Sequence, residues 1–195
     1  LRMLAQAHAQ HGKLPWAKLF EPAVNLATRG FAISPRLHAQ LKADAYLRLD
    51  PTARAYFYQA NGEPHAVGHL LRNPELAVVL QRIAVEGVQA FYSGEVAEAV
   101  VRKVQQHPNN PGRLALRDLA DYQAKERAPV CFDHAAASRV YRVCGFPPPS
   151  SGAIAMGQIL GMLQHTPASL MSPPTETVDG TPDPRWLHLY TEASR

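Results

Sequence analysis

Apolar residues recur every three or four positions along most of the chain, and glycine or proline separates the runs, as is typical of short helices. The first two predicted helices are residues 2–11, which end at Gly12, and residues 22–29, which end at Gly30. Ser34 followed by Pro35 predicts the start of a third helix, whose apolar positions continue to Leu47.

The same signals return further along the chain. Asn73 before Pro74 predicts a helix whose apolar face includes Leu76 and Ile83 and which ends at Gly87. Three more helical segments are predicted, one capped by Ser93, one over residues 116–122 and one after Gly152. Residues 166–185 are rich in proline, threonine, serine and aspartate, which predicts a loop.

Two regions are expected to be extended. Asn61-Gly62 is a strong turn signal, and it predicts a small hairpin or paired extended segments over residues 55–67. Residues 129–132 and 139–144 read as two strands around a turn near 134–138. The predicted fold class is therefore α/β (α+β), mostly helical with a small antiparallel sheet contribution.

Composition narrows the class of protein. The 195 residues are 46% apolar and 18% charged, which excludes collagen, coiled coil and wholesale disorder. No apolar run reaches the ~20 residues that a membrane span needs. The net charge of +4 comes from scattered basic residues, whereas nucleic-acid binding favours a basic face, so neither a membrane span nor a nucleic-acid partner is expected.

Both ends of the sequence fall within apolar, helix-like stretches, Leu1–Leu4 and Trp186–Arg195. No signal peptide precedes the first stretch, and no glycine or proline stop follows the second. We therefore expect residues 1–195 to form one segment from inside a longer chain, truncated at both ends. Apolar faces left open around Trp186–Tyr190 predict self-association.

Two histidine pairs are candidates for a metal site. His65 and His69 have the i, i+4 spacing of zinc ligands, but the turn-like setting around Gly68 argues against a helix, and Ala66 stands where a metalloprotease has its glutamate. His8 and His11 have no third ligand nearby in the sequence. All four are interpreted as surface histidines, and no metal is expected.

Ser150-Ser151-Gly152 precedes a predicted helix and leaves two interpretations open. One serine is a nucleophile or contributes to an anion site at the helix N-terminus. Alternatively, the serine caps the helix after a polyproline segment, which we favour because Pro149 stands where a nucleophile elbow has glycine.

The acidic residues Asp118, Asp121 and Glu126 lie among basic neighbours, which indicates a solvated, salt-bridged face. The sequence contains no phosphate-binding glycine loop and no Cys-x-x-Cys motif. The histidines, serines and acidic residues discussed above do not form a complete catalytic or metal-binding set. We therefore assign no catalytic, cofactor-binding or metal-binding residue in this chain.

Four stretches in order resemble the gamma-glutamyltranspeptidase family. They are Leu14–Ala23 continuing through Phe31, Asn73–Gly94, Leu119–Val130 and Pro147–Gly152, the last similar to the family motif PPPSSGG. Ala153 stands where the family usually has a second glycine. Gly152 is retained and still allows the backbone to pass closely at this point. The resemblance covers nearly the whole chain.

The resemblance implies an N-terminal-nucleophile hydrolase, an αββα sandwich made as one precursor that cuts itself into large and small subunits. A threonine at the new N-terminus attacks the γ-glutamyl amide of glutathione or related compounds, and the glutamyl group passes to an amino acid, a peptide or water. The Thr-Thr-His-like start of the small subunit does not occur in this sequence, and the substrate-binding arginine of the family lies upstream of these blocks. Neither Thr191 nor any arginine here receives those roles.

The implied partners are the rest of the precursor, including the small subunit, and γ-glutamyl compounds, with no cofactor. Because family members are usually exported, the implied location is periplasmic or secreted. Two other hypotheses remain open: a relative acting on poly-γ-glutamate or on cephalosporin-type acyl compounds, and a non-catalytic helical interaction module of the same ancestry.

The two cysteines lie in the two predicted strands. In an antiparallel hairpin, opposed residues lie equally far along the chain from the centre of the turn. If the turn is centred between residues 137 and 138, Cys131 therefore faces Cys144. A disulfide fits this register, and an exported parent supplies the oxidising compartment. The alternative is two reduced, buried thiols that behave as small hydrophobic groups.

Overall fold

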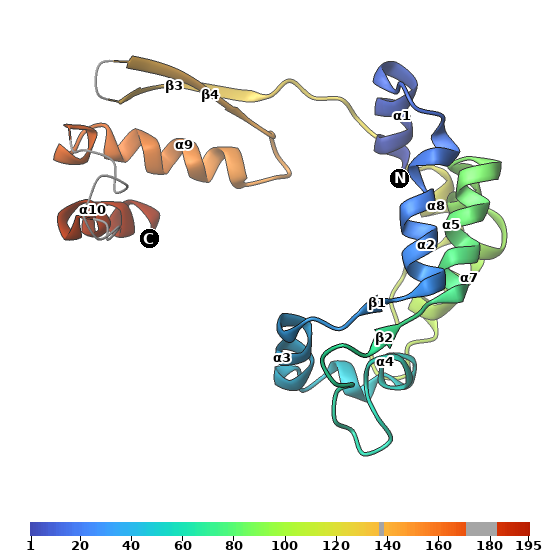
Figure 1. Ribbon diagram of the computed structural model, residues 1–195. Helices are drawn as coiled ribbons and strands as arrows, with labels where there is room; N and C mark the ends of the chain where they lie inside the picture. Colours follow the sequence, from blue (N-terminus) through green and yellow to red (C-terminus); the bar gives the residue numbers. More distant parts are fainter. Residues whose placement is uncertain (137–138, 171–182) are drawn as a thin grey trace. The chain divides into compact units, whose positions relative to one another are not determined.

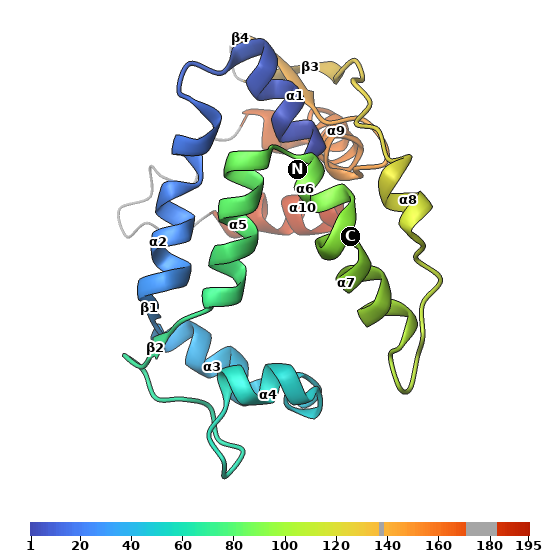
Figure 2. The ribbon, with the colours of Figure 1, turned by 90° about the vertical axis from the view of Figure 1, so that its right-hand side faces the viewer.

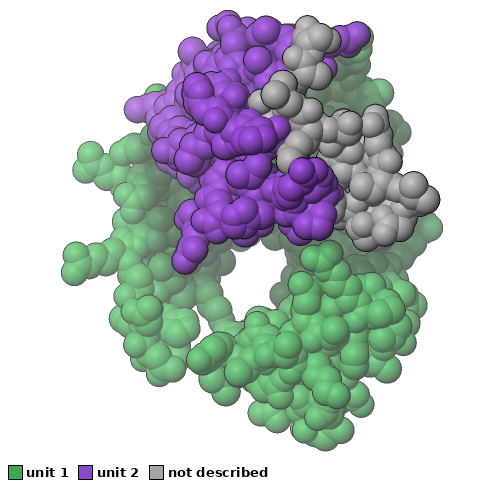
Figure 3. Space-filling view, turned by 90° about the vertical axis from the view of Figure 1, so that its left-hand side faces the viewer, with its two compact units in different colours: residues 1–124 green, residues 125–195 purple. Residues whose placement is uncertain are grey.

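The computed structural model describes residues 1–136, 139–170 and 183–195, and the chain forms two compact units. Unit 1 is Leu1–Ala124 and unit 2 is Lys125–Arg195, coloured separately in Figure 3. Within the described residues, no helix is both long enough and apolar enough to cross a membrane.

Unit 1 is built almost entirely from short helices (Figures 1 and 2). Its helical elements are α1 (Arg2–His11), η1 (Trp16–Leu19), α2 (Glu21–Arg29), α3 (Pro35–Ala43), η2 (Leu47–Leu49), α4 (Pro51–Phe57), α5 (Pro74–Glu86), α6 (Gln89–Tyr92), α7 (Gly94–Gln105) and α8 (Leu116–Ala120). One two-residue ladder joins distant parts of unit 1, because β1 (Phe31–Ala32) pairs antiparallel with β2 (Leu70–Leu71).

The predicted helix boundaries follow from local chemistry. Ser34 Oγ accepts the Leu37 N–H at 3.1 Å, and Asn73 Oδ1 accepts the Leu76 N–H at 2.9 Å, so these two predicted N-caps are confirmed. The third predicted cap, Ser93, precedes α7 but makes no side-chain cap hydrogen bond. At the other ends, Gly30 (φ 90°) and Gly87 (φ 84°) adopt positive φ angles that favour glycine. The sequence signals therefore place α2, α3 and α5 correctly at these residues.

The core of unit 1 lies between α2 and α5, which run side by side in Figure 2. Ile33 and Ile83 are 1% and 2% exposed, the most completely buried large side chains of the described residues. The indole N–H of Trp16 donates to the carbonyl oxygen of Ile83 at 3.0 Å, which fixes η1 against α5. Packing and one long-range hydrogen bond therefore hold these helices together.

One prediction for unit 1 is wrong, and another is confirmed only in part. The helix that begins after Ser34 ends at Ala43, short of Leu47, because Asp44 Oδ1 accepts the backbone N–H groups of Tyr46 and Leu47 and turns the chain. The extended pairing predicted over residues 55–67 is confirmed only around the Asn61-Gly62 turn, where Tyr58 and Pro64 form an antiparallel bridge and the Gln59 N–H donates to the Glu63 carbonyl oxygen at 2.8 Å.

Residues 55–57 of that predicted hairpin belong to α4. Asp50 Oδ1 accepts the Ala53 N–H at 2.8 Å, and Pro51 occupies the first helical position, so an N-terminal cap starts a helix here.

Unit 2 consists of a hairpin and two longer helices. Its elements are β3 (Val130–Ala136), β4 (Arg139–Gly145), α9 (Gly152–Leu163), η3 (Pro167–Leu170) and α10 (Pro184–Ser194). Both strands are longer than predicted, and β3 includes His134, which the sequence placed in the turn. The loop predicted over 166–185 is wrong where it can be checked, because Pro167–Leu170 form η3 and α10 begins at Pro184, and residues 171–182 lie outside the described residues.

The register of the hairpin confirms the prediction for the cysteines. Cys131 pairs with Cys144, their Cα atoms are 4.2 Å apart, and the two residues form a disulfide. The expectation of a mostly helical chain with a small antiparallel sheet is also confirmed.

Helix α9 packs closely against the β3–β4 hairpin at two glycines. A Cβ atom on Gly157 would lie 3.0 Å from Cε1 of Phe132, and one on Gly145 would lie 2.7 Å from Cβ of Ala153. The two glycines therefore allow the helix and the hairpin to approach closely.

Candidate functional site

The serines singled out in the sequence lie in the turn between β4 and α9. The Ser150 N–H donates to the carbonyl oxygen of Pro147 at 3.2 Å, and the bond between Pro148 and Pro149 is cis. Ser151 is the N-cap residue of α9 but makes no side-chain cap hydrogen bond. The Gly152 N–H lies 3.4 Å from Ser150 Oγ instead.

This turn lacks the partners that a serine nucleophile needs. Activation requires a base within hydrogen-bond reach of the hydroxyl, as in a Ser–His pair. Among the described residues, the hydrogen-bond partner of Ser150 Oγ is the Gly152 amide, and no histidine or carboxylate bonds to either serine hydroxyl. The geometry supports a role for Ser150 in starting the helix, in line with the interpretation favoured from the sequence.

The histidine pair of the 58–69 loop is brought together as a stack. The rings of His65 and His69 are parallel within 6°, with centroids 3.9 Å apart, and neither residue is in a helix. Within the described ranges, no three histidine, cysteine or acidic side chains gather as metal ligands. Burial lowers the pKa of His65, and the positive charge that His69 can carry lowers it further.

Acidification from about pH 7.5 to about pH 5.5 is expected to destabilise unit 1 through His65. Since its folded-state pKa lies below the ordinary value of about 6.5, the unfolded chain binds this proton more tightly than the folded chain. The stabilisation is complete above the ordinary pKa and is lost as the pH falls through the folded value. Melting temperatures across this range measure the effect.

His65→Gln is expected to flatten this dependence, whereas His11→Gln, at an exposed histidine of α1, is expected to leave it unchanged. Equal pH dependence in both variants would contradict the role given to His65.

The other polar candidates make local structural contacts. His8 Nε2 lies 2.7 Å from the carbonyl oxygen of Leu14, and its ring packs edge-on against Trp16. Arg117 pairs with Asp121 at 3.0 Å on an exposed face of α8, as the charge pattern predicts. Such surface pairs contribute little to stability, and these groups form no site.

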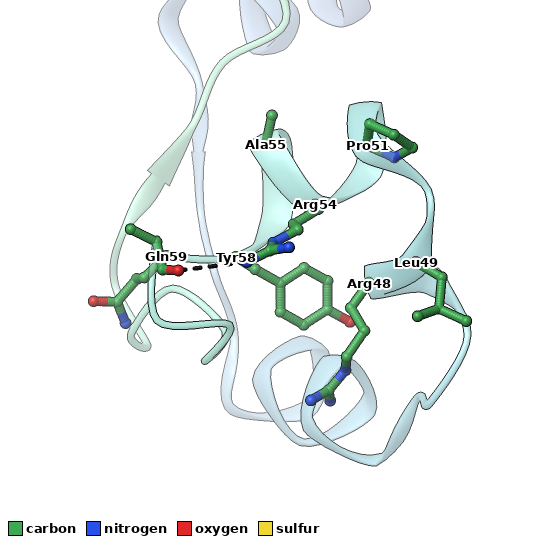
Figure 4. Close-up of a pocket in the computed structure, with 8 residues that line it drawn as sticks. Arg48, Leu49, Pro51, Arg54, Ala55, Tyr58 and Gln59 are labelled. Carbon is green, nitrogen blue, oxygen red and sulfur yellow. Dashed lines mark hydrogen bonds between the residues drawn. The ribbon is translucent and has the colours of Figure 1, made fainter.

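A cavity of about 480 Å³ lies beside Tyr58 (Figure 4). The ring of Tyr58 lies between Arg48 and Arg54, and two guanidinium groups in one cavity are a possible anion site. However, Arg48 donates to the carbonyl oxygens of Lys42 and Asp44 at 3.1 Å each, and the Tyr58 hydroxyl donates to the Leu41 carbonyl oxygen at 2.9 Å. These donors are already used to hold the C-terminal carbonyls of α3, so the cavity borders a structural clamp.

Comparison with known proteins decides the family. The family model described as "Gamma-glutamyltranspeptidase" matches residues 1–195, the whole sequence. The chain belongs to the gamma-glutamyltranspeptidase family. The resemblance of the four sequence stretches is thereby confirmed.

Similar members of the gamma-glutamyltranspeptidase family include plant and bacterial proteins. The chain is 40% identical over 160 residues to Glutathione hydrolase 2 of Arabidopsis thaliana, which covers 82% of this chain and 26% of that protein. It is 32% identical over 192 residues to the Glutathione hydrolase proenzyme of Pseudomonas aeruginosa, covering 98% of this chain and 31% of that protein. It is also 33% identical over 165 residues to the Acylase ACY 1 proenzyme of a Pseudomonas species (strain SE83), covering 84% of this chain and 28% of that protein.

The fold agrees with a solved gamma-glutamyltranspeptidase. The crystal structure of the Helicobacter pylori gamma-glutamyltranspeptidase superposes with a TM-score of 0.77 at 28% identity, covering 98% of this chain and 51% of that one. The chain thus spans about a third or less of the curated relatives above and about half of that solved chain.

The family blocks occupy structural positions in this part of a gamma-glutamyltranspeptidase. Trp16 fixes η1 to α5, Asn73 caps α5, and the hydroxyl of the buried Tyr92 accepts the Arg2 N–H at 3.1 Å. The sequence did not reveal the clamp formed by Arg48 and Tyr58, because its partners are backbone carbonyls that carry no residue-specific signal.

Proposed function

We propose that these 195 residues form a segment of the large subunit of a gamma-glutamyltranspeptidase precursor. The parent would cleave the γ-glutamyl amide of glutathione and related compounds and transfer the glutamyl group to amino acids, peptides or water. The observation that carries this proposal is the family match along residues 1–195, supported by relatives named glutathione hydrolases.

The chemistry would be that of an N-terminal threonine in an αββα sandwich. Its hydroxyl attacks the γ-glutamyl carbonyl, and its own α-amine accepts the hydroxyl proton. The amide C–N bond then breaks, the leaving amine takes up that proton, and the acyl-enzyme remains. That threonine would come from the small subunit, as the word proenzyme in the name of one relative supports. In this proposal the described helices are scaffold, and the remainder of the precursor is the partner that completes the active site.

The purified 195-residue chain is expected to release no product from a γ-glutamyl anilide, because the attacking threonine is not among its residues. The parent protein, assayed in parallel, is expected to release the anilide at a rate proportional to its concentration. Absorbance of the released amine is the measurement.

Turnover proportional to the concentration of the chain alone would overturn this assignment. Ser150→Ala and Ser151→Ala variants would then identify the serine responsible, since each removes one candidate nucleophile of the turn before α9. A parent protein without activity on the anilide would instead favour the non-catalytic interaction module.

A second candidate function is acyl-amide hydrolysis of the cephalosporin-acylase type, favoured by the 33% identity to the Acylase ACY 1 proenzyme. The glutathione hydrolase assignment is preferred because identity to a glutathione hydrolase reaches 40%. A parent that hydrolyses an acylated cephalosporin faster than a γ-glutamyl anilide would reverse this preference.

We also propose that the parent is exported to the periplasm or secreted. The Cys131–Cys144 disulfide supports this location, since disulfides persist in oxidising compartments and are rare in the cytosol. Self-association through apolar side chains is a further part of the proposal, supported by Leu187 and Tyr190 of α10, which are 46% and 41% exposed.

A further inference from the structure

A second cavity of unit 1, of about 690 Å³, lies between the start of α4 and the end of α7. Leu49, Pro51 and Pro108 form an apolar part of its lining, and Arg102, Lys103 and His107 form a basic part. This volume lies within the range of small-molecule sites, which typically combine apolar walls with a few polar groups. No motif in the sequence pointed to this cavity, because its two sides are about fifty positions apart in the chain.

Both oxygens of the acidic group in the lining already have a partner. Asp50 Oδ1 accepts the Ala53 N–H at 2.8 Å, and Asp50 Oδ2 pairs with Lys103 Nζ at 3.3 Å. The Ala53 amide first, and then Lys103, lower the pKa of this carboxyl, which keeps it ionised at neutral pH. Asp50 therefore holds Lys103 at the cavity and leaves no carboxylate to satisfy the other basic groups.

Several donors of the cavity lack a protein partner. Within the part of the chain that the structure describes, the Arg102 guanidinium makes no hydrogen bond or ion pair. His107 Nδ1 lies 3.1 Å from the Asn110 N–H and acts as an acceptor, so the ring hydrogen of the neutral imidazole is on Nε2 and available for donation. This distinguishes the cavity from the one beside Tyr58, where the donors hold backbone carbonyls.

We propose that this cavity binds a small organic acid with two carboxylate groups, held by Arg102 and Lys103, and an apolar body resting on Leu49 and Pro108. The planar guanidinium of Arg102 matches a carboxylate in a two-point hydrogen bond. The ammonium of Lys103 has three donors, so it can bind a second carboxylate while it keeps its contact with Asp50. The proposal is independent of the proposed catalytic function, since all the lining residues belong to unit 1 and none is assigned a catalytic role.

The test is an NMR titration of the 195-residue chain with phenylsuccinate, an aromatic dicarboxylate, and with its neutral diamide in parallel. Saturable amide shifts confined to residues around α7 and the start of α4 are expected for the diacid and not for the diamide. Arg102→Gln is expected to weaken binding about fivefold or more, because it removes a charge-assisted hydrogen bond at a partly exposed site.

The matched control is Arg36→Gln, at an exposed arginine of α3 outside the cavity. This variant is expected to bind the diacid as tightly as the unsubstituted 195-residue chain. Circular dichroism of each variant confirms that it is folded. Equal binding of diacid and diamide, equal weakening by both substitutions, or the absence of saturable shifts would each overturn the proposal.

Discussion

Ile83→Ala is expected to lower the free energy of unfolding of unit 1 by roughly 2–5 kcal/mol, the range for truncating a fully buried aliphatic side chain. Ile83 is 2% exposed, and its helix α5 packs against α2 and η1, so the lost methyl groups leave a cavity that close-packed neighbours fill poorly. Urea denaturation followed by circular dichroism measures the change.

The same helix offers a matched control for this substitution. Val85 is 83% exposed, and Val85→Ala is expected to change stability by less than about 0.5 kcal/mol. If the two alanine variants unfold at the same urea concentration, the core assigned to α2 and α5 is wrong.

Loss of the Cys131–Cys144 disulfide is expected to destabilise unit 2 by at most about 3 kcal/mol, the chain-entropy value for a loop of this length. The bond joins residues separated by 13 positions across the hairpin, so it restricts the unfolded chain and fixes the strand register. Unfolding of the chain with and without reductant measures the contribution.

The double variant Cys131→Ser/Cys144→Ser supplies the control, because its stability is expected to be the same with and without reductant. Intact mass before and after reduction tests the bond directly, with an expected gain of two hydrogen atoms. Two freely alkylated thiols in the unreduced chain would contradict the disulfide.

Local chemistry made part of the fold predictable. Asn73 with Pro74 and Ser34 with Pro35 each set a helix start by a side-chain cap and a proline at the first turn, and both signals lie within a few residues. Asp50 and Pro51 carry the same signal, and applying it there would have identified α4 ahead of the paired turn. The Asn61-Gly62 turn does form, and the error was to extend its flanking segment back over residues 55–57, which belong to the helix.

Contacts between segments far apart in the chain could not be predicted from the sequence in the same way. The ladder of Phe31–Ala32 with Leu70–Leu71 is too short to show an alternating pattern, so nothing in the sequence pairs these segments. The cavity at Arg102 likewise depends on two segments brought together by folding. Cys131 and Cys144 are the exception, since a hairpin register can be calculated from the position of its turn.

The close approach of α9 to the hairpin also limits how this part of the chain can evolve. A side chain at position 157 would occupy space that the ring of Phe132 fills, and a side chain at position 145 would occupy that of Ala153. A side chain at either glycine therefore requires the facing residue, Ala153 or Phe132, to shift. A substitution of either glycine is therefore expected to persist only together with a compensating change in the residue that faces it.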